Sequence, residues 1–584
     1  MGRPLSGVPH VGRRTETRKD GTKYIYERTT IYDPQTKKIK VLGCKLIGKI
    51  LKGSNEIIKT RPKKPAAPKP VAPVKVARSH VGASEILDFV GKQSGIDTCI
   101  LRSLPQAEAL KAISLARYLA ACDRKTLPGI ETWQLNHQIP YLEPLTERVY
   151  GTLFEQLGRN ESWIQNYFRH IASTLEKEPA LALDSTTFST YSTNLKEARY
   201  GFNKDADGLP TIKFVTLYSV KNRLPIAYCK QPGNIPDVIS IQTALKQLSV
   251  LGVTKPLIVT DNGYYSMGNM VEFLDSNMKF LTLASRSATW LRDIVEEALA
   301  ELDNLDNICP YDTQVKGKTV SKMQEFSRLR HRSTASAKAG ETQKFSRRIY
   351  VHILRNSEIQ TCKTRALEEE LTALRSTVLS GEELSESAAK KVEKYLILSR
   401  QGRGGKLTVK FNQEAFNETA KFFGLFVLVS NKAQDCFEAL EDYRLREKTE
   451  EAFGIYKEYC DGRKPRVWTG DRLRGRQFVQ FIALSYRCWL IGKVREIKEL
   501  LAKWLVEKEK KSEKSKAEKL LSWLDNRSLA QILDWFDCIE ETTVASKAGE
   551  IRWKTESIER DKFFLSLLGD RKSTRLNSSH GKLS

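Results

Sequence analysis

The chain lacks any Cys-x-x-Cys pair, and its ten cysteines stand singly between Cys44 and Cys538. The seven histidines are equally dispersed and complete no ligand spacing of a zinc site. Long hydrophobic runs are also missing: the apolar stretch FGLFVLVS at 423–430 has eight residues, whereas a membrane span needs about 20. There is no signal-peptide pattern either. The sequence therefore predicts a reduced, intracellular protein without a structural zinc, a catalytic thiol or a membrane span.

Acidic residues are scarce in the N-terminal part of the chain. The first 80 residues contain 20 Lys or Arg and 5 Asp or Glu, so they hold +15 of the formal net charge of +26. A basic arm of this kind indicates a polyanionic partner that is bound with salt-sensitive affinity. Charge alone does not distinguish DNA from ribosomal RNA or an anionic membrane surface.

The most informative pattern is Y-x-x-R-x-x-x-E-x(6)-K, formed by Tyr443, Arg446, Glu450 and Lys457 within EDYRLREKTEEAFGIYKEYC. At about 100° per residue, the four positions fall within roughly one 60° sector of an α-helix. A carboxylate flanked by cations suits a metal ion held against a phosphodiester. The alternative is a solvated charged helix with i,i+4 ion pairs.

Glu450 has three rivals for the role of the acidic residue, because Glu447, Glu451 and Glu458 belong to the same expected helix. Glu451 is the closest competitor, and it is rotated by about 100° from the Tyr-Arg-Lys stripe. The helical phase therefore favours Glu450.

Two aspartates upstream follow short apolar runs that predict buried strands. Asp184 follows residues 180–183 in PALALDSTTFSTYS, and Asp261 follows residues 256–260 in KPLIVTDNGYYS. Either aspartate, standing alone, is also explained as a cap or turn residue. The order strand with Asp, hairpin, helix, strand with Asp, helix, strand predicts a mixed sheet covered by helices, with both carboxylates at strand ends.

Together these features resemble the DDE transposases of bacterial insertion sequences, which are built on a ribonuclease H-like core. Asp184, Asp261 and Glu450 carry the resemblance, and the Tyr-Arg-Glu-Lys signature matches without a gap. Further likeness lies in ARYGFNKDADGLPTIKFVTLYS, in the PGN of QPGNIPDV and in KPRVWTGDRLRGRQFVQFIALSYRCWL. The resemblance covers roughly residues 176–495. It implies an α/β fold with a ribonuclease H-like mixed sheet interrupted by a strand-rich insertion, preceded by a basic β unit and a helical domain.

The resemblance also implies a catalytic role for Asp184, Asp261 and Glu450 as ligands of two divalent ions, Mg²⁺ or alternatively Mn²⁺, with Asp184 bridging them. Cutting DNA and joining its 3′ end are both in-line displacements at phosphorus, and two ions roughly 3.5–4 Å apart stabilise the attacking and leaving oxygens. Mg²⁺ prefers oxygen ligands, which three carboxylates supply. In this interpretation Arg446 and Lys457 contact phosphates, while Tyr443 orients a phosphate or flanks a base.

Trp468 lies beside Arg463, Lys464 and Arg466 in GRKPRVWTG. A tryptophan among cations can stack on a flipped or frayed base. A lone tryptophan is also explained as an anchor of the core or of a domain contact. The sequence leaves both interpretations of Trp468 open.

Composition and the Asp261 to Glu450 spacing of 189 residues divide the chain into segments. Residues 291–420 are the expected insertion, because that spacing exceeds what the core requires and because RRIYVHILR, KYLILSR and KLTVKFN are strand-like. The residues 570–584, which include DRKSTRLNSSH, resemble the translation of a sequencing adapter, and we expect them to be an artefact. The other expected segments are a basic β-rich unit (1–60), a Pro/Lys linker (61–80), a helical DNA-binding domain (81–177), the two parts of the catalytic core (178–290 and 421–500) and a C-terminal helical region (501–569).

The expected function is that of a metal-dependent DNA transposase, which binds the terminal repeats of its own element, cuts at the ends and transfers the 3′ hydroxyls to target DNA. The alternatives are a ribonuclease H-like nuclease without strand transfer and an inactive DNA-binding protein derived from such an element. Synapsis of two ends implies at least a homodimer. The expected location is the bacterial cytoplasm, at the nucleoid. The terminal repeat, the target preference and the second-strand mechanism stay open.

Overall fold

The computed structural model describes residues 7–60, 75–122, 126–203, 206–219, 221–285, 288–329, 340–400, 407–444, 446–507, 511–546 and 549–569. The chain divides into two compact units. Unit 1 contains Met1–Lys75 and Ala545–Gly549, and unit 2 contains Val76–Val544 and Glu550–Ser584. The expected artefact at 570–584 and most of the expected linker lie outside the described residues.

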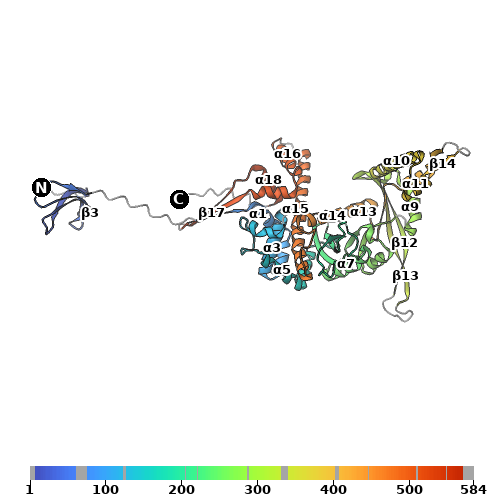
Figure 1. The fold of residues 1–584 in the computed structure, drawn as a ribbon, viewed down its shortest axis with the longest axis horizontal. Coiled ribbons are helices and arrows are strands. Elements are labelled where there is room, and N and C mark those ends of the chain that lie inside the picture. Colours follow the sequence, from blue (N-terminus) through green and yellow to red (C-terminus); the bar gives the residue numbers. More distant parts are fainter. Residues whose placement is uncertain are drawn as a thin grey trace. The chain divides into compact units, whose positions relative to one another are not determined.

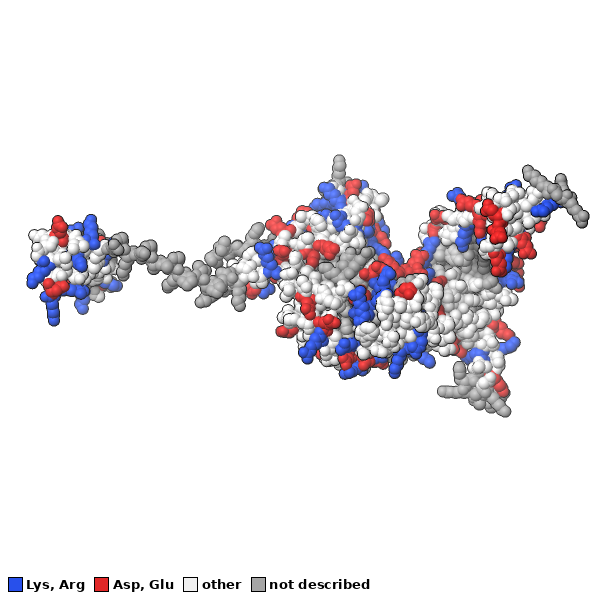
Figure 2. Space-filling model, in the orientation of Figure 1, with Lys and Arg blue, Asp and Glu red and all other residues white. Residues whose placement is uncertain are grey.

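Unit 1 is an antiparallel sheet of β1 (His10–Thr17), β2 (Lys23–Asp33), β3 (Lys38–Ile50) and β4 (Ile58–Lys59), in that spatial order. Asp33 lies at the β2–β3 turn, where its Oδ1 accepts a hydrogen bond from the Gln35 amide at 2.9 Å. Among the described residues of this unit, Ile25 is the only buried apolar side chain. Lys and Arg side chains cover much of its visible surface (Figure 2).

A helical region opens unit 2. Its apolar residues recur at helical spacing and share one core with the sheet that follows. The elements are α1 (Gly82–Gln93), α2 (Ile96–Ser103), α3 (Gln106–Ala121), η1 (Leu127–Gly129), α4 (Ile130–Gln134), α5 (Glu147–Arg159) and α6 (Glu161–Ala172). The long helix α15 (Gly470–Glu507) packs against α3 and α5 on one side and against β8 (Leu224–Pro232) of the sheet on the other (Figure 1).

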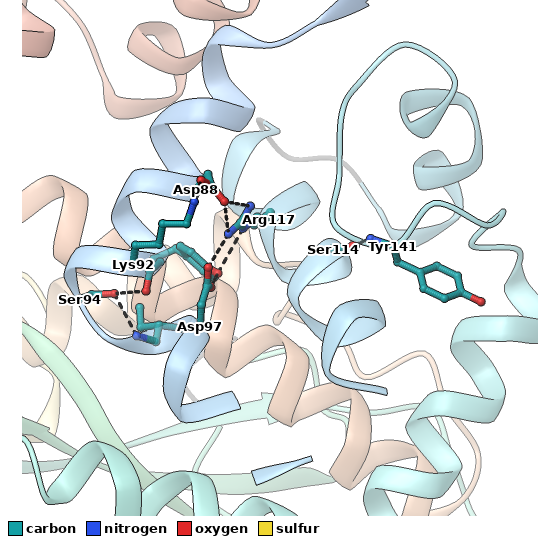
Figure 3. Close-up of polar contacts among 10 residues, drawn as sticks. Asp88, Lys92, Ser94, Asp97, Ser114, Arg117 and Tyr141 are labelled. Carbon is teal, nitrogen blue, oxygen red and sulfur yellow. Dashed lines mark hydrogen bonds and ion pairs between the residues drawn. The ribbon is translucent and has the colours of Figure 1, made fainter. Parts of the chain in front are cut away.

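A buried ionic network holds this helical region together (Figure 3). The guanidinium of Arg117 in α3 donates to Asp97 of α2 at 2.5 Å and to Asp88 of α1 at 3.2 Å. Arg117 Nε also donates to the Tyr486 hydroxyl of α15 at 3.3 Å, and that hydroxyl donates to Asp97. Because Arg117 and Tyr486 are 6% and 0% exposed, α2, α3 and α15 meet at desolvated partners, while Asp88 joins α1 to them through a side chain that is 42% exposed.

The centre of unit 2 is a nine-stranded mixed sheet in the order β11-β12-β13-β16-β10-β9-β6-β7-β8. Strands β6, β9 and β10 are parallel neighbours, while β7 and β8 are antiparallel to their neighbours. The core strands are β6 (Ala180–Ser189), β7 (Thr211–Ser219), β8, β9 (Leu257–Thr260), β10 (Lys279–Ala284) and β16 (Leu425–Ser430), with α7 (Asp237–Leu251), η2 (Asn262–Tyr264) and α8 (Met267–Asp275) in the connections. The expected mixed α/β fold is therefore present.

The region expected as an insertion contributes strands to this same sheet. β12 (Asp312–Leu329) and β13 (Thr342–Asn356) form a long hairpin, and β13 pairs with β16 from Tyr350↔Ser430 to Arg355↔Leu425. The end of β13 at 349–355, IYVHILR, is nearly all buried, and it has β12 and β16 as its neighbours in the sheet. The remaining elements of the region are α9 (Thr289–Leu302), η3 (Leu305–Asn307), β11 (Ile308–Cys309), α10 (Ser357–Ser380), α11 (Glu386–Tyr395), the β14 (Leu396–Arg400)–β15 (Leu407–Phe411) hairpin and α12 (Gln413–Ala420).

After the sheet, the chain continues through α13 (Cys436–Arg444), α14 (Glu447–Tyr459) and α15. The C-terminal elements are α16 (Lys511–Asp525), α17 (Leu529–Asp537), β17 (Glu540–Ser546), β18 (Gly549–Lys554) and α18 (Glu559–Leu568), and β5 (Lys75–His80) forms a three-stranded sheet with β17 and β18. This region was expected to be helical, and it also contains a strand pair. In the described part of the chain, no helix combines the length and the apolar character that a membrane crossing requires.

Candidate active site

The sheet register brings the two aspartates together. Ala182 of β6 pairs with Val259 of the parallel strand β9, so Asp184 and Asp261 each lie two residues farther along neighbouring strands. Because side chains alternate, both carboxylates emerge on the same face of the sheet. Asp261 follows the end of β9, as expected. The prediction that Asp184 also ends its strand is wrong, since β6 continues to Ser189 along its pairing with β7.

The Tyr-Arg-Glu-Lys signature occupies two helices instead of the single helix that its spacing predicts. Tyr443 lies in α13, and Arg446 is the N-cap of α14, which carries Glu450 in its first turn and Lys457 in its last. The chain tightens where the helices meet: the Arg446 amide donates to the Tyr443 carbonyl at 2.9 Å, and the Thr449 amide donates to the Arg446 carbonyl at 2.8 Å. These are i,i+3 bonds, which are typical of helix ends.

One nitrogen of Arg446 lies close to the carboxylates of all three acidic residues. Its Nη1 lies 2.8 Å from Glu450 Oε1, 3.6 Å from Asp184 Oδ2 and 3.7 Å from Asp261 Oδ2. The Arg446 side chain is only 12% exposed, and its Nε is buried without a hydrogen-bond partner among the described atoms. Burial acts to lower the pKa of Arg446, but Tyr443, Asp261 and Glu450 together raise it above its ordinary value, so the guanidinium stays charged.

Tyr443 orients one of these carboxylates. Its hydroxyl donates to Asp261 Oδ1 at 3.2 Å, and its ring lies 5.5 Å from the Arg446 guanidinium. Burial, and secondly the charge of Asp261, raise the pKa of the Tyr443 hydroxyl above its ordinary value. Tyr443 therefore remains a hydrogen-bond donor at neutral pH. Because an α-helix rises about 1.5 Å per residue, Lys457 lies about 10 Å beyond Glu450 along α14. Lys457 is not among the described residues that line the cavity.

The structure distinguishes Glu450 from its rivals by their partners. Glu451 pairs with Arg495 of α15, and Glu458 pairs with Arg463. Glu447 is exposed at the start of α14. Glu450 is the glutamate of α14 that reaches Arg446 and lines the cavity with both aspartates.

This cavity has a volume of about 460 Å³ and contains polar residues that the sequence did not single out. Lys213 of β7 is 6% exposed, and its Nζ lies 2.8 Å from Asp237 Oδ1 at the start of α7. Ser185, next to Asp184, donates its hydroxyl to the same Asp237 oxygen at 2.7 Å. In the sequence, the signal that could have identified Lys213 is the position of a lysine inside the apolar run TIKFVTLYS. The lining residues are Asp184, Ser185, Thr186, Thr187, Phe202, Lys213, Gly233, Asn234, Ile235, Pro236, Asp237, Asp261, Gly263, Tyr264, Arg446 and Glu450.

The donor set is suited to a hard divalent cation. Asp184, Asp261 and Glu450 supply carboxylate oxygens alone, which Mg²⁺ and Mn²⁺ prefer. They already converge on one cationic atom, Arg446 Nη1. Within the part of the chain that the structure describes, however, no group of three His, Cys, Asp or Glu side chains is arranged closely enough to hold a metal ion. A metal ion would therefore have to replace Arg446 as the cation shared by the three carboxylates.

Replacing Arg446 by glutamine is expected to destabilise the chain by about 1–2 kcal/mol without divalent ions, because three carboxylates lose a common cation. The effect is kept small by the exposure of Asp261 and Glu450, whose side chains are 40% and 57% accessible to water. Mg²⁺ should raise the melting temperature of this variant more than that of the wild type, as measured by differential scanning fluorimetry.

Arg444→Gln is the matched control for Arg446→Gln. Arg444 pairs with Asp312, which lies outside the cavity, so its loss should not change the response to Mg²⁺. Equal Mg²⁺-induced shifts in the wild type and both variants would contradict the competition between Arg446 and a metal ion.

Comparison with known proteins identifies the family of the chain. A protein-family model described as "Transposase DDE domain" matches residues 175–486, more than half of the chain. Among solved structures, the chain is similar to a cryo-EM structure of a piggyBac transposase synaptic complex with hairpin DNA, at 9% sequence identity and a TM-score of 0.32. That match covers 78% of this chain and 82% of the other. No curated protein matches the chain.

Proposed function

Because the chain belongs to the family of proteins with a transposase DDE domain, we propose that it cuts DNA at the ends of its own transposable element and joins the freed 3′ ends to target DNA. The convergence of Asp184, Asp261 and Glu450 on Arg446 in one open cavity carries this proposal. Transposases of this family generally use divalent metal ions.

Asp184, Asp261 and Glu450 are the proposed metal ligands. Divalent ions held there would stabilise the attacking and leaving oxygens of an in-line displacement at phosphorus. The chain positions the ligands in advance. The Ser185 amide donates to Asp184 Oδ1 at 2.7 Å, and Tyr443 donates to Asp261. Each bond limits the rotation of a carboxylate, which lowers the cost of organising the site.

The cations of the signature are proposed to bind the DNA backbone. Arg446, once released from the carboxylates, presents a planar fork that suits a phosphate, and Lys457 contributes a point charge along the same helix. Lys213 has a different role, because its contacts with Asp237 and the Ile235 carbonyl hold the beginning of α7 at the cavity wall. Each of the two element ends has to be cut and joined, so the active assembly is proposed to be at least a dimer.

The test is a strand-transfer assay with the full chain, Mg²⁺, labelled DNA carrying the ends of the element that encodes it, and a supercoiled target plasmid. We expect labelled ends covalently joined to the plasmid. Cut ends without joining would replace the proposal with a nuclease. Bound but uncut ends would indicate a DNA-binding protein that has lost its activity.

A further inference from the structure

Two connections, one of which lines the cavity, expose large aromatic side chains to solvent. The β6–β7 connection carries Tyr191, Tyr200 and Phe202, which are 67%, 76% and 77% exposed. The α14–α15 connection carries Trp468, which is 62% exposed. That exposure excludes the alternative in which Trp468 anchors the core. Rings of this size normally bury 150–250 Å², so several exposed rings next to a cavity indicate a binding surface.

The two connections lie against each other, and the β6–β7 connection reaches the cavity. Lys464 of the α14–α15 connection donates to the Tyr191 hydroxyl at 2.9 Å, and its ammonium lies 4.2 Å from the Tyr191 ring centroid. Phe202 lines the same cavity as Asp184 and Glu450. We group the exposed rings of the two contacting connections, Tyr191, Tyr200, Phe202 and Trp468, as the aromatic platform, which reaches the proposed site of chemistry through Phe202.

The backbone of the α14–α15 connection is held in place. Asp461 is buried in an ion pair with Arg476, and its carbonyl accepts from Gln480 at 2.6 Å. Gly462 packs so closely on Tyr456 that a Cβ at this position would lie 2.4 Å from the ring. Asp461 and Arg466 both have left-handed φ angles, of 54° and 50°. Such strain persists only where surrounding contacts maintain it, so this connection presents its side chains from a defined backbone.

The β6–β7 connection is anchored in a similar way. The Arg199 amide donates to the Thr211 carbonyl at 3.0 Å, and the Thr211 amide donates back to the Arg199 carbonyl at 2.8 Å. A Cβ at Gly201 would lie 2.3 Å from the Gly233 carbonyl oxygen, so the backbone between Tyr200 and Phe202 packs directly against the backbone at Gly233. The exposed rings of Tyr200 and Phe202 therefore flank a backbone position that is held in place by packing.

Cations accompany the rings in both connections. Arg199, Arg463 and Arg466 are exposed, and Lys464 is half-buried against Tyr191. The guanidinium and ammonium groups suit phosphates, and flat exposed rings suit the faces of unpaired bases. The combination of stacking surfaces with backbone-binding cations is that of sites for single-stranded nucleic acid.

We propose that the aromatic platform binds unpaired nucleotides of the DNA strand next to the phosphate that is cut, with Phe202 and Trp468 stacking on bases. The inference rests on the proposed function for the identity of the strand as DNA. Stacking there holds the strand end beside Asp184 and Glu450 and disfavours its return to a duplex. The platform thus selects frayed or already open ends over closed duplexes.

The test compares the affinity of the full chain, without divalent ions, for a blunt duplex and for the same duplex with a six-nucleotide 3′ overhang that contains 2-aminopurine. We expect the overhang to bind about 10-fold more tightly, with quenched 2-aminopurine fluorescence as the sign of stacking. Trp468→Ala and Phe202→Leu should each remove most of this preference and of the quenching. Trp468→Phe retains a ring and should keep both.

Trp553→Ala is the matched control, because Trp553 is 52% exposed on β18, outside both connections and the cavity lining. Truncating exposed side chains should leave the melting temperature nearly unchanged. The proposal is overturned if Trp468→Ala and Phe202→Leu keep the overhang preference, or if Trp553→Ala loses it equally. The binding assay needs no cleavage, so the two proposals can fail separately. A chain that prefers the overhang but does not transfer strands would reject only the proposed function. A chain that transfers strands without this preference would reject only the role of the platform.

Discussion

Replacing Asp184 by asparagine is expected to lower the rates of DNA cleavage and strand transfer by at least about 10³-fold, which corresponds to roughly 4 kcal/mol of transition-state stabilisation. Asp184 is the most buried of the three carboxylates, at 8% exposed, and it is held by the Ser185 amide and by Arg446. Asparagine keeps the shape but removes the charge that binds a divalent ion. Rates measured at saturating Mg²⁺ with pre-bound DNA ends report this loss directly.

Asp261→Asn and Glu450→Gln should show the same loss, because all three carboxylates share Arg446 Nη1 and the cavity. Glu451→Gln is the control: it removes the same charge one residue along α14, where Glu451 pairs with Arg495 and faces a different cavity. DNA-end binding should persist in every variant. Normal cleavage by Asp184→Asn, or an equal loss in Glu451→Gln, would place the chemistry elsewhere.

The second large effect concerns stability: Asp97→Ala should lower the free energy of unfolding by about 3–5 kcal/mol, because it leaves a buried guanidinium without its closest partner. The side chains of Arg117 and Asp97 are 7% and 12% exposed, so water cannot replace the lost contact. Urea titration followed by tryptophan fluorescence measures the loss, and hydrogen exchange should place it in α2, α3 and the centre of α15.

Removing both partners should recover part of this stability. In Asp97→Ala/Arg117→Met no charge remains buried without a partner, and methionine restores apolar volume beside Tyr486. Lys92→Ala provides the comparison, because Lys92 makes an exposed pair with Asp88 and should contribute no more than about 1 kcal/mol. A loss in Asp97→Ala no larger than that of Lys92→Ala would contradict the proposed importance of the network.

Local chain geometry allowed several features to be predicted from the sequence. The apolar runs before Asp184 and Asp261 predict β6 and β9, and both strands are buried in the sheet. The phase of the signature favours Glu450 over Glu451, and the structure places Glu450 on Arg446 while Glu451 turns to Arg495. The strand predictions are confirmed because side-chain alternation depends only on the backbone of one strand. The phase argument for Glu450 assumed one continuous helix, and the catalytic role of Glu450 stays a prediction.

Features that depend on distant partners were decided by the tertiary structure. Asp184 lies inside β6 because β7 pairs along it to Ser189, whereas β9 pairs only as far as Ala182. The signature divides between α13 and α14, which places Tyr443 on Asp261 and Arg446 among three carboxylates. The Lys213–Asp237 pair joins residues 24 positions apart at the same cavity.

The sequence by itself therefore predicted which residues have the proposed chemical roles and most of the local elements on which they lie, because composition and periodicity are local properties. Only the tertiary structure decided that one guanidinium is shared by all three carboxylates, that the β12–β13 hairpin extends the core sheet, and that Trp468 faces solvent. Each of these depends on strand pairing or packing between segments far apart in the sequence, and such contacts leave no signal in the spacing of a single segment.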